Sequence, residues 1–163
     1  MKVVNEHYYQ FIYHTIAIEG NTLTPQQVRE VLSTGKAPLG ADVRELAEVI
    51  GMEAAIQLVN RTIEFPITEE HILALHRRVL SSDPDNGGEY RRHQVYVGNF
   101  APPDETQVPR MMSEFAAFLQ SEDFQSLHPI RQAALAHHRL TYIHPFVYVK
   151  CNTKKAHQNF FEK

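Results

Sequence analysis

Leu135 to Phe146, LAHHRLTYIHPF, carries the strongest signal of fold and function in this chain. Apolar residues recur at helical spacing up to Ile143, so the pattern predicts a helix over residues 130–143. That helix delivers His144 at its end, as a helix approaching an active site does. After Phe146 the composition changes, because VYVKCNTKKAHQNFFEK holds four lysines and neither leucine nor isoleucine.

Helical signals also dominate the rest of the chain. Capping residues and apolar spacing predict helices over residues 4–18, 25–34, 43–62, 69–80 and 108–120. Thr24 and Gln27 form an expected capping box, and Gly35 is the expected stop. Asp42 and Glu45 form a second expected box. We expect the helix that follows to bury one stripe, made of Val43, Leu46, Ile50, Ala54 and Leu58. His71 and His76 are expected on a helix surface.

One segment has the pattern of a strand. Arg92 to Val97, RHQVYV, alternates in the way of a half-buried strand and follows the turn-rich residues 83–88. Gly98 and then Pro102 and Pro103 end it. We therefore expect a small β-hairpin that rests on the helices as a flap. The predicted fold class is all-α with this one hairpin.

The bulk composition limits the classes of function. The chain has 163 residues, of which 43% are hydrophobic and 21% charged, and its net charge is -3. This suits one globular domain, or one domain with a helical extension, and the absence of a basic stripe argues against a nucleic-acid partner. No membrane anchor or signal peptide is expected within these residues. Cys151 is the one cysteine, either an incidental thiol or a reactive one near Lys150.

Three motifs together resemble one family. They are TIAIEGN at residues 15–21, VYVGNFAPP at residues 95–103 and the run that ends at Phe146. They are similar to those of Fic-domain proteins, above all the metazoan protein adenylyltransferases of the endoplasmic reticulum. The resemblance implies a helical extension over residues 1–66, the first part of a Fic core over 67–146 and an atypical tail over 147–163.

The resemblance also implies an activity, a cofactor and partners. Members of this family move AMP from ATP to a hydroxyl of a target protein, and this subgroup also removes it. The implied cofactor is Mg²⁺ or Mn²⁺. The implied target is a chaperone of the BiP type, and a homodimer is a further implication. The implied location is the lumen of the endoplasmic reticulum, held there by a membrane anchor that these residues do not contain.

The family signature, H-x-F-x-(D/E)-G-N-G-R-x-x-R, gives roles to individual residues. His144 matches the general base, and Phe146 matches the aromatic side chain that seats the loop. Beyond Phe146 the chain departs from the signature, because Tyr148 stands at the metal ligand's position and Val149 to Cys151 stand on G-N-G. Asn152 and Lys155 stand on the two arginines. Losing these groups together predicts a poor or inactive enzyme.

Two further sites follow from the other motifs. Thr15, Glu19 and Gly20 match the inhibitory helix of the family, in which the glutamate pairs with the last arginine of the signature. The alternative for Glu19 is a solvated carboxylate near a helix end. The end of the flap touches the nucleotide in relatives, which assigns that role to Val97, Gly98, Asn99 and Phe100. The alternative is a plain surface hairpin.

Several interpretations of the whole chain stay open. A composition with AT-rich codons after Phe146 suggests that residues 147–163 come from intron read-through or a frameshift, and the rival hypothesis is a divergent pseudoenzyme. Such a protein would be a non-catalytic module that binds a partner or nucleotide. A metal hydrolase using His137, His138 and His144 is a weaker alternative, because neighbouring helical residues diverge by about 100°. We expect no metal site formed by these histidines.

Overall fold

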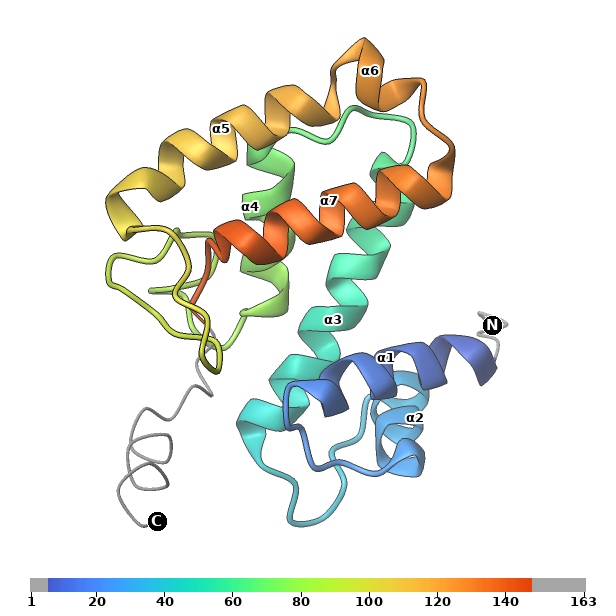
Figure 1. Cartoon of the computed structure of the whole chain (residues 1–163). Helices are drawn as coiled ribbons and strands as arrows, with labels where there is room; N and C mark the ends of the chain where they lie inside the picture. Colours follow the sequence, from blue (N-terminus) through green and yellow to red (C-terminus); the bar gives the residue numbers. More distant parts are fainter. Residues whose placement is uncertain (1–5, 148–163) are drawn as a thin grey trace.

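Helices form almost all of the regular structure in the computed structural model, which describes residues 6–147 (Figure 1). The elements in chain order are α1 (Glu6–Ile18), α2 (Pro25–Thr34), α3 (Val43–Thr62), α4 (Glu69–Val79), η1 (Glu105–Gln107), α5 (Val108–Leu119), α6 (Glu122–Gln125) and α7 (Pro129–Ile143). The six longer helices agree with the predicted ranges to within about two residues at most ends. The short α6 and the 3-10 turn η1 were not predicted.

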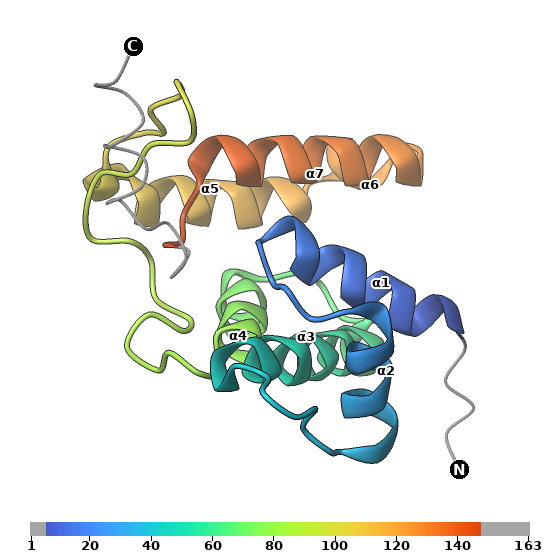
Figure 2. The ribbon, with the colours of Figure 1, turned by 90° about the horizontal axis from the view of Figure 1, so that it is seen from below.

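Two apolar cores hold the helices together. The first joins α1, α2 and α3 and is built on Ile12, Ile16, Leu23, Val28, Val31 and Val49. The second joins α4, α5, α6 and α7 and is built on Ile72, Val108, Met112, Phe115, Leu119, Phe124 and Ile143. Figures 1 and 2 show α5 and α7 lying side by side, with α3 running alongside α4. The contact between α3 and α4 therefore connects the two cores.

Gly51 sets how closely α3 and α4 approach. A Cβ atom at this position would lie 2.5 Å from the carbonyl oxygen of Arg78 and 2.7 Å from that of Val79. Only a residue without a side chain fits between these two backbones. The crossing of α3 over α4 thus depends on a glycine in the middle of a helix.

The helix ends confirm most of the predicted caps. Thr24 and Gln27 make the full capping box, and Gly35 ends α2 in the left-handed conformation with φ 70°. Asp42 caps α3 through the N–H of Arg44, but the second capping box is wrong. The carboxylate of Glu45 accepts a hydrogen bond from the N–H of Thr22 at 2.6 Å instead of turning back to the cap. It ties α3 to the α1–α2 turn.

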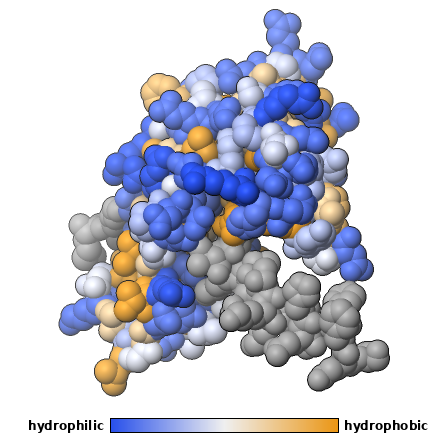
Figure 3. Space-filling model, turned by 90° about the vertical axis from the view of Figure 1, so that its left-hand side faces the viewer, coloured by the Kyte–Doolittle hydropathy of each residue, from blue (hydrophilic) through white to orange (hydrophobic). Residues whose placement is uncertain are grey.

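The predicted buried stripe of α3 is wrong at two of its five positions, whereas Leu46 packs against the first core and Ala54 and Leu58 are partly buried. Val43 is 78% exposed and Ile50 54% exposed, whereas Val49, Gly51 and Ala55 are buried. The reason is that α3 packs on α1 and α2 along one side and on α4 along another, so its buried residues do not follow a single stripe. Figure 3 shows apolar side chains gathered at the lower end of the molecule, the end that holds the α2–α3 loop in Figure 1.

No strand occurs within residues 6–147, so the predicted hairpin is not confirmed. The segment between α4 and α5 is a loop whose tip is closed by a single bridge, in which Val97 and Phe100 exchange backbone hydrogen bonds of 2.9 and 3.0 Å. Pro102 and Pro103 have no N–H to donate to a ladder. The amide of Gln94 bonds the Pro102 carbonyl at 2.9 Å, where a backbone donor would have stood in a hairpin.

Some predictions about organisation stay predictions. The boundary near residue 66 and the separate character of residues 147–163 are not decided by the described residues, and all of the tail except Val147 lies outside them. None of the helices in residues 6–147 combines the length and apolar character that a bilayer crossing requires.

Candidate functional site

His144 lies at the C-terminal end of α7 in a left-handed turn. Its φ is 46° and its ψ 61°, and it is the one non-glycine residue between positions 6 and 147 with a positive φ. Its N–H donates to the carbonyl of Leu140 at 2.9 Å, which closes the last turn, and Pro145 cannot extend the helix. A non-glycine residue in this conformation is uncommon and needs support from its surroundings.

The surroundings of His144 favour a neutral imidazole. The side chain is half-buried, and this burial lowers its pKa, with a smaller lowering from the positive charge of Arg91. A neutral imidazole can accept a proton at neutral pH, which is what a general base must do. The described geometry is therefore compatible with the role that the sequence resemblance gives to His144.

Phe146 anchors the chain just after His144. Its ring stacks on the imidazole of His76, with centroids 3.8 Å apart and planes at 15°, and lies 5.8 Å from the ring of Tyr90. It packs against the second core. The prediction that His76 lies on a helix surface is wrong, because the residue is half-buried and its ring is stacked on Phe146. The role of Phe146 in seating the loop stays a prediction that this packing supports.

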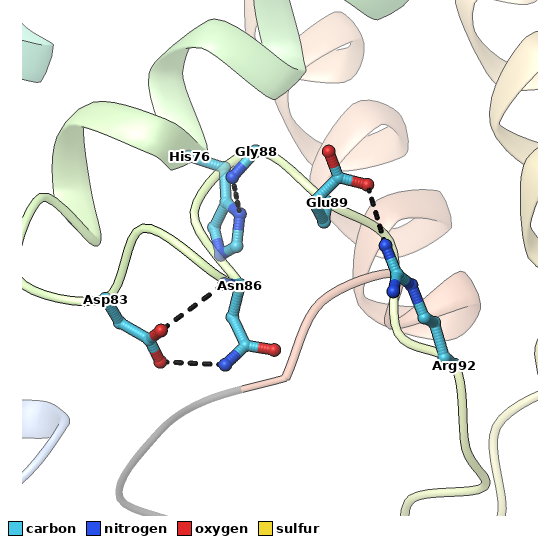
Figure 4. Close-up of polar contacts among 6 residues, drawn as sticks. All are labelled: His76, Asp83, Asn86, Gly88, Glu89 and Arg92. Atoms are coloured by element: carbon cyan, nitrogen blue, oxygen red, sulfur yellow. Dashed lines mark hydrogen bonds and ion pairs between the residues drawn. The ribbon is translucent and has the colours of Figure 1, made fainter.

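The turn after α4 holds His76 in one tautomer (Figure 4). The N–H of Gly88 donates to Nδ1 of His76 at 3.0 Å, so this nitrogen carries no proton. Burial lowers the pKa of His76 to about 4, which keeps the ring neutral. The turn itself is closed by Asp83, whose carboxylate accepts from the side chain of Asn86 at 2.8 Å and from its N–H at 3.3 Å.

Tyr90 completes the packing under Phe146. Its hydroxyl donates to the carboxylate of Glu69 at 2.8 Å. Burial, this hydrogen bond and the charge of Glu69 raise the pKa of Tyr90, so it stays protonated. Glu69 lies in the first turn of α4, and the bond therefore ties the start of the loop to that helix.

Arg91 connects this loop to the end of α7. The residue is 3% exposed. Its guanidinium donates to four backbone carbonyls, those of His93, Pro103, Ile143 and His144. Its own N–H donates to the carbonyl of Pro145 at 2.8 Å. The residue that precedes the predicted flap thus bonds the backbone on both sides of His144.

The tip of the loop lies beside the last turn of α7. Val97 and Phe100 are 46% and 40% exposed, and Gly98 and Asn99 are exposed as well. The ring of Phe100 lies 5.8 Å from that of Tyr142, two residues before His144. The structure therefore brings the predicted nucleotide-binding tip and the predicted base to one end of the molecule. Their binding role stays a prediction.

Glu19 lies in the turn that ends α1. Figures 1 and 2 show the C-terminal end of α1 facing the side of the molecule on which α7 ends. Burial raises the pKa of Glu19, and the charge of Glu48 raises it further. Its predicted partner, Lys155, lies outside the described residues. Within residues 6–147 Glu19 makes no ion pair, and its inhibitory role stays a prediction.

Asn21 fixes the turn that follows Glu19. It is buried, and its side chain donates to the carboxylate of Glu48 at 2.8 Å and to the carbonyl of Glu45 at 3.2 Å. Its Oδ1 accepts from the N–H of Leu23 at 3.1 Å. Gly20 takes a φ of 87° between them, a conformation that favours glycine.

The described residues do not fit a divalent cation. No group of three or more histidine, cysteine, aspartate or glutamate residues in positions 6–147 could hold an ion. His137 and His138 are exposed neighbours on α7. Tyr148, Val149, Lys150, Cys151, Asn152 and Lys155, the residues that fall on the rest of the signature, lie outside the described part of the chain.

Comparison with known proteins decides the family. The model of the Fic/DOC family matches residues 66–148. The chain belongs to the Fic/DOC family. As a Fic chain, it is similar over 145 residues to a protein named protein adenylyltransferase Fic from Drosophila ananassae, with 46% identity, and to the protein of that name from Drosophila virilis, with 48% identity.

Solved Fic structures agree with this assignment. Fic-1 from C. elegans superposes with a TM-score of 0.81 and 38% identity, over 89% of this chain and 44% of that one. A Fic-domain signaling protein from Bacteroides thetaiotaomicron superposes with a TM-score of 0.77 and 28% identity, over 85% of this chain and 55% of that one. The two Drosophila matches cover 87% of this chain but only 29% and 30% of those proteins.

Sequence patterns missed three residues of this Fic site. Arg91 and Tyr142 join the loop to the end of α7, and His76 joins α4 to Phe146. Each does so through contacts with residues distant in sequence. Tyr142 was visible only as part of the helical run. Arg91 stands in the run EYRR, where nothing distinguishes it from its exposed neighbour Arg92.

Proposed function

We propose that this chain carries the base-bearing part of a protein adenylyltransferase, which moves AMP from ATP to a hydroxyl of a target protein. The observation that carries the proposal is His144, held as a neutral imidazole at a helix end beside an exposed loop tip. The names of the Drosophila relatives support the same activity.

The chemistry asked of His144 is proton acceptance. Its imidazole takes the proton of the target hydroxyl as the hydroxyl oxygen attacks the α-phosphorus of ATP. The new P–O bond joins AMP to the target, and the bond to the leaving pyrophosphate breaks. A positioned base of this kind contributes about 10²–10⁴-fold to the rate. Positioning and charge stabilisation at the phosphates would have to supply the rest.

The loop tip is the proposed contact for the nucleotide and the target. Val97, Gly98, Asn99 and Phe100 present apolar and amide groups beside the last turn of α7. The rings of Phe100 and Tyr142 form an exposed aromatic surface next to the base. Such a surface can pack against a flat purine ring.

Glu19 is the proposed brake, and the proposed aid to AMP removal. Burial, and to a smaller extent the charge of Glu48, raise the pKa of Glu19 above its ordinary value. A carboxylate facing the phosphate side of the site would oppose productive ATP binding and could orient a water for the reverse reaction. Mg²⁺ or Mn²⁺ is the expected ion of the family. A luminal chaperone of the BiP type in the endoplasmic reticulum is the expected target.

The signature positions after Phe146 favour a weak enzyme. Tyr148 supplies no carboxylate for a metal, and Val149 to Cys151 replace the glycine-containing loop. For this reason a second function stays in view, that of a non-catalytic Fic-like module that binds a partner or nucleotide. The exposed tip at Val97 and Phe100 favours this second function, because it offers a contact surface without chemistry.

Transfer of AMP labelled on its phosphorus tests the two functions. The chain is incubated with α-labelled ATP, Mn²⁺ or Mg²⁺ and a BiP-type chaperone, with His144→Ala as the matched control. Label that depends on His144 supports the enzyme, and Glu19→Gly is expected to increase it. Equal label in the chain and in His144→Ala would overturn the enzyme proposal, and ATP binding by calorimetry would then test the binding module.

A further inference from the structure

Arg91 is the one buried charged side chain among residues 6–147. Burying a charge is costly unless it is paired or fully hydrogen-bonded. No carboxylate in this part of the chain makes an ion pair with Arg91. Asp104 and Glu105 are the acidic groups whose charge acts on it, and the carboxylate of Asp104 accepts bonds from the N–H and hydroxyl of Thr106. Backbone carbonyls therefore satisfy this guanidinium.

These carbonyls belong to three separate backbone segments. The Nη1 atom bonds His93 at 3.2 Å, on the outgoing arm of the loop, and Nη2 bonds Pro103 on the returning arm. The Nε atom bonds His144 at 2.8 Å. One planar group thus holds both arms of the loop against the end of α7, which a flexible ammonium could not do with the same geometry.

The carbonyls of α7 involved here are ones that the helix leaves without a partner. The last four C=O groups of a helix have no intrahelical N–H, and those of Ile143 and His144 are among them at this end. The contact from Nη2 to Ile143 is longer, at 3.5 Å. The left-handed turn at His144 places its carbonyl within hydrogen-bond distance of Nε of Arg91.

We propose that Arg91 is a positioning residue, which clamps the loop of residues 89–103 to the left-handed end of α7 and so sets both the direction of the His144 ring and the place of the Phe100 tip. This inference rests on the proposed function only for the role of His144 as a base. The clamp itself is a property of the fold. It touches neither the nucleotide nor the target in this assignment.

The charge of Arg91 gives the clamp an electrostatic readout. It lowers the pKa of His144 in addition to the lowering by burial. Removing the clamp removes this charge and, by releasing the loop, also exposes the ring to water. Both changes raise the pKa of His144 toward its ordinary value. A side chain that only filled space would not move this titration.

Two variants of Arg91 and one control test the clamp. Arg91→Met removes the positive charge and the hydrogen bonds of the guanidinium. Arg91→Lys keeps the charge but lacks the planar guanidinium that bonds several carbonyls at once. Gln94→Ala is the matched control, because its amide ties the same loop through Val95 and Pro102 but bonds neither Ile143 nor His144. The titration of His144 is followed by NMR, with His144→Ala assigning the signal, and the loop by limited proteolysis between residues 92 and 102.

We expect a higher pKa of His144 in Arg91→Met and an unchanged one in Gln94→Ala. Loop cleavage is expected to rise at least about tenfold in both Arg91 variants, as loss of two or more charged hydrogen bonds implies. Should Arg91→Met not fold, Arg91→Lys carries the test through cleavage alone. An unmoved titration in folded Arg91→Met, or unchanged cleavage in Arg91→Lys, overturns the proposal. Neither readout needs ATP or turnover, so failure of AMP transfer leaves the test intact.

Discussion

The contact of α3 with α4 at Gly51 yields a prediction whose sign opposes ordinary helix propensity. Gly51→Ala places a methyl group 2.5 Å from the carbonyl oxygen of Arg78 and 2.7 Å from that of Val79. Ordinary van der Waals contact begins near 3.4 Å, so one helix must move by about 0.9 Å relative to the other. Both obstacles are backbone atoms, and no rotamer change can relieve them.

The magnitude follows from two opposing terms. Replacing glycine by alanine inside a helix stabilises it by about 1 kcal/mol. Overpacking between closely packed backbones costs about 1–3 kcal/mol, and the upper part of the range applies where nothing can rotate away. The shift also loosens Val49 and Ala55, which are buried on either side of Gly51 along α3. We expect a net destabilisation of about 2 kcal/mol, and a fall in Tm of about 4–8 °C.

Urea unfolding followed by far-UV circular dichroism measures this change. Asn60→Ala is the matched control, because residue 60 is exposed in the last turn of the same helix. It gains propensity without a clash, so its urea midpoint is expected to stay or rise slightly. A Gly51→Ala protein as stable as the parent would refute the reasoning, since the helices would then be free to separate without cost.

Three further predictions concern the site. His76 has a pKa of about 4 in the folded chain against 6.5 in the unfolded chain, so its contribution to stability is complete above pH 6.5 and is lost as the pH falls toward 4. Thermal unfolding should show a loss of roughly 1–2 kcal/mol in the free energy of unfolding, a value discounted for partial exposure. The loss should be absent from His76→Gln. Asn21→Ala removes a buried side chain with three hydrogen bonds and should cost about 1–3 kcal/mol in urea, whereas exposed Thr22→Ala should cost less than about 0.5. Replacing residues 148–152 by Asp-Gly-Asn-Gly-Arg should raise AMP transfer at least about 100-fold, and no gain would count against the lost phosphate loop as the cause of weakness.

Local signals explain which parts of the fold could be predicted from sequence. Thr24 and Gln27 act on the first turn of α2 and Gly35 acts on its last turn, and their predicted roles are confirmed. Glu45 was misjudged because its hydrogen-bond partner, the N–H of Thr22, lies in the α1–α2 turn. Ile50 was misjudged because α3 packs on α1 and α2 and also on α4, which leaves Ile50 exposed. The requirement for glycine at position 51 could not be predicted for the same reason, since it comes from the close approach of the α4 backbone.

The site divides along the same line. His144, Phe146 and the loop tip could be located by their motifs, because those residues stand at fixed spacings. The role of Arg91 could not be predicted, since its carbonyl partner at His144 is 53 residues away. Every residue has a backbone carbonyl, so the residue type at position 144 does not indicate this bond. The expected hairpin failed on Pro102 and Pro103, whose lack of N–H outweighed the alternating pattern before Gly98.

Within residues 6–147, the contacts that hold His144, the proposed base, come from residues that precede the altered part of the signature. Arg91, in the loop after α4, bonds the carbonyl of His144, and His76, within α4, stacks on Phe146. None of these contacts draws on a residue after Phe146. We therefore expect the described contacts of His144 to stay in place when the signature positions after Phe146 change, because these contacts come from other segments of the chain. Loss of AMP transfer and loss of the fold are then expected to be separate events. The free energy of unfolding therefore does not report on how the chain binds phosphate.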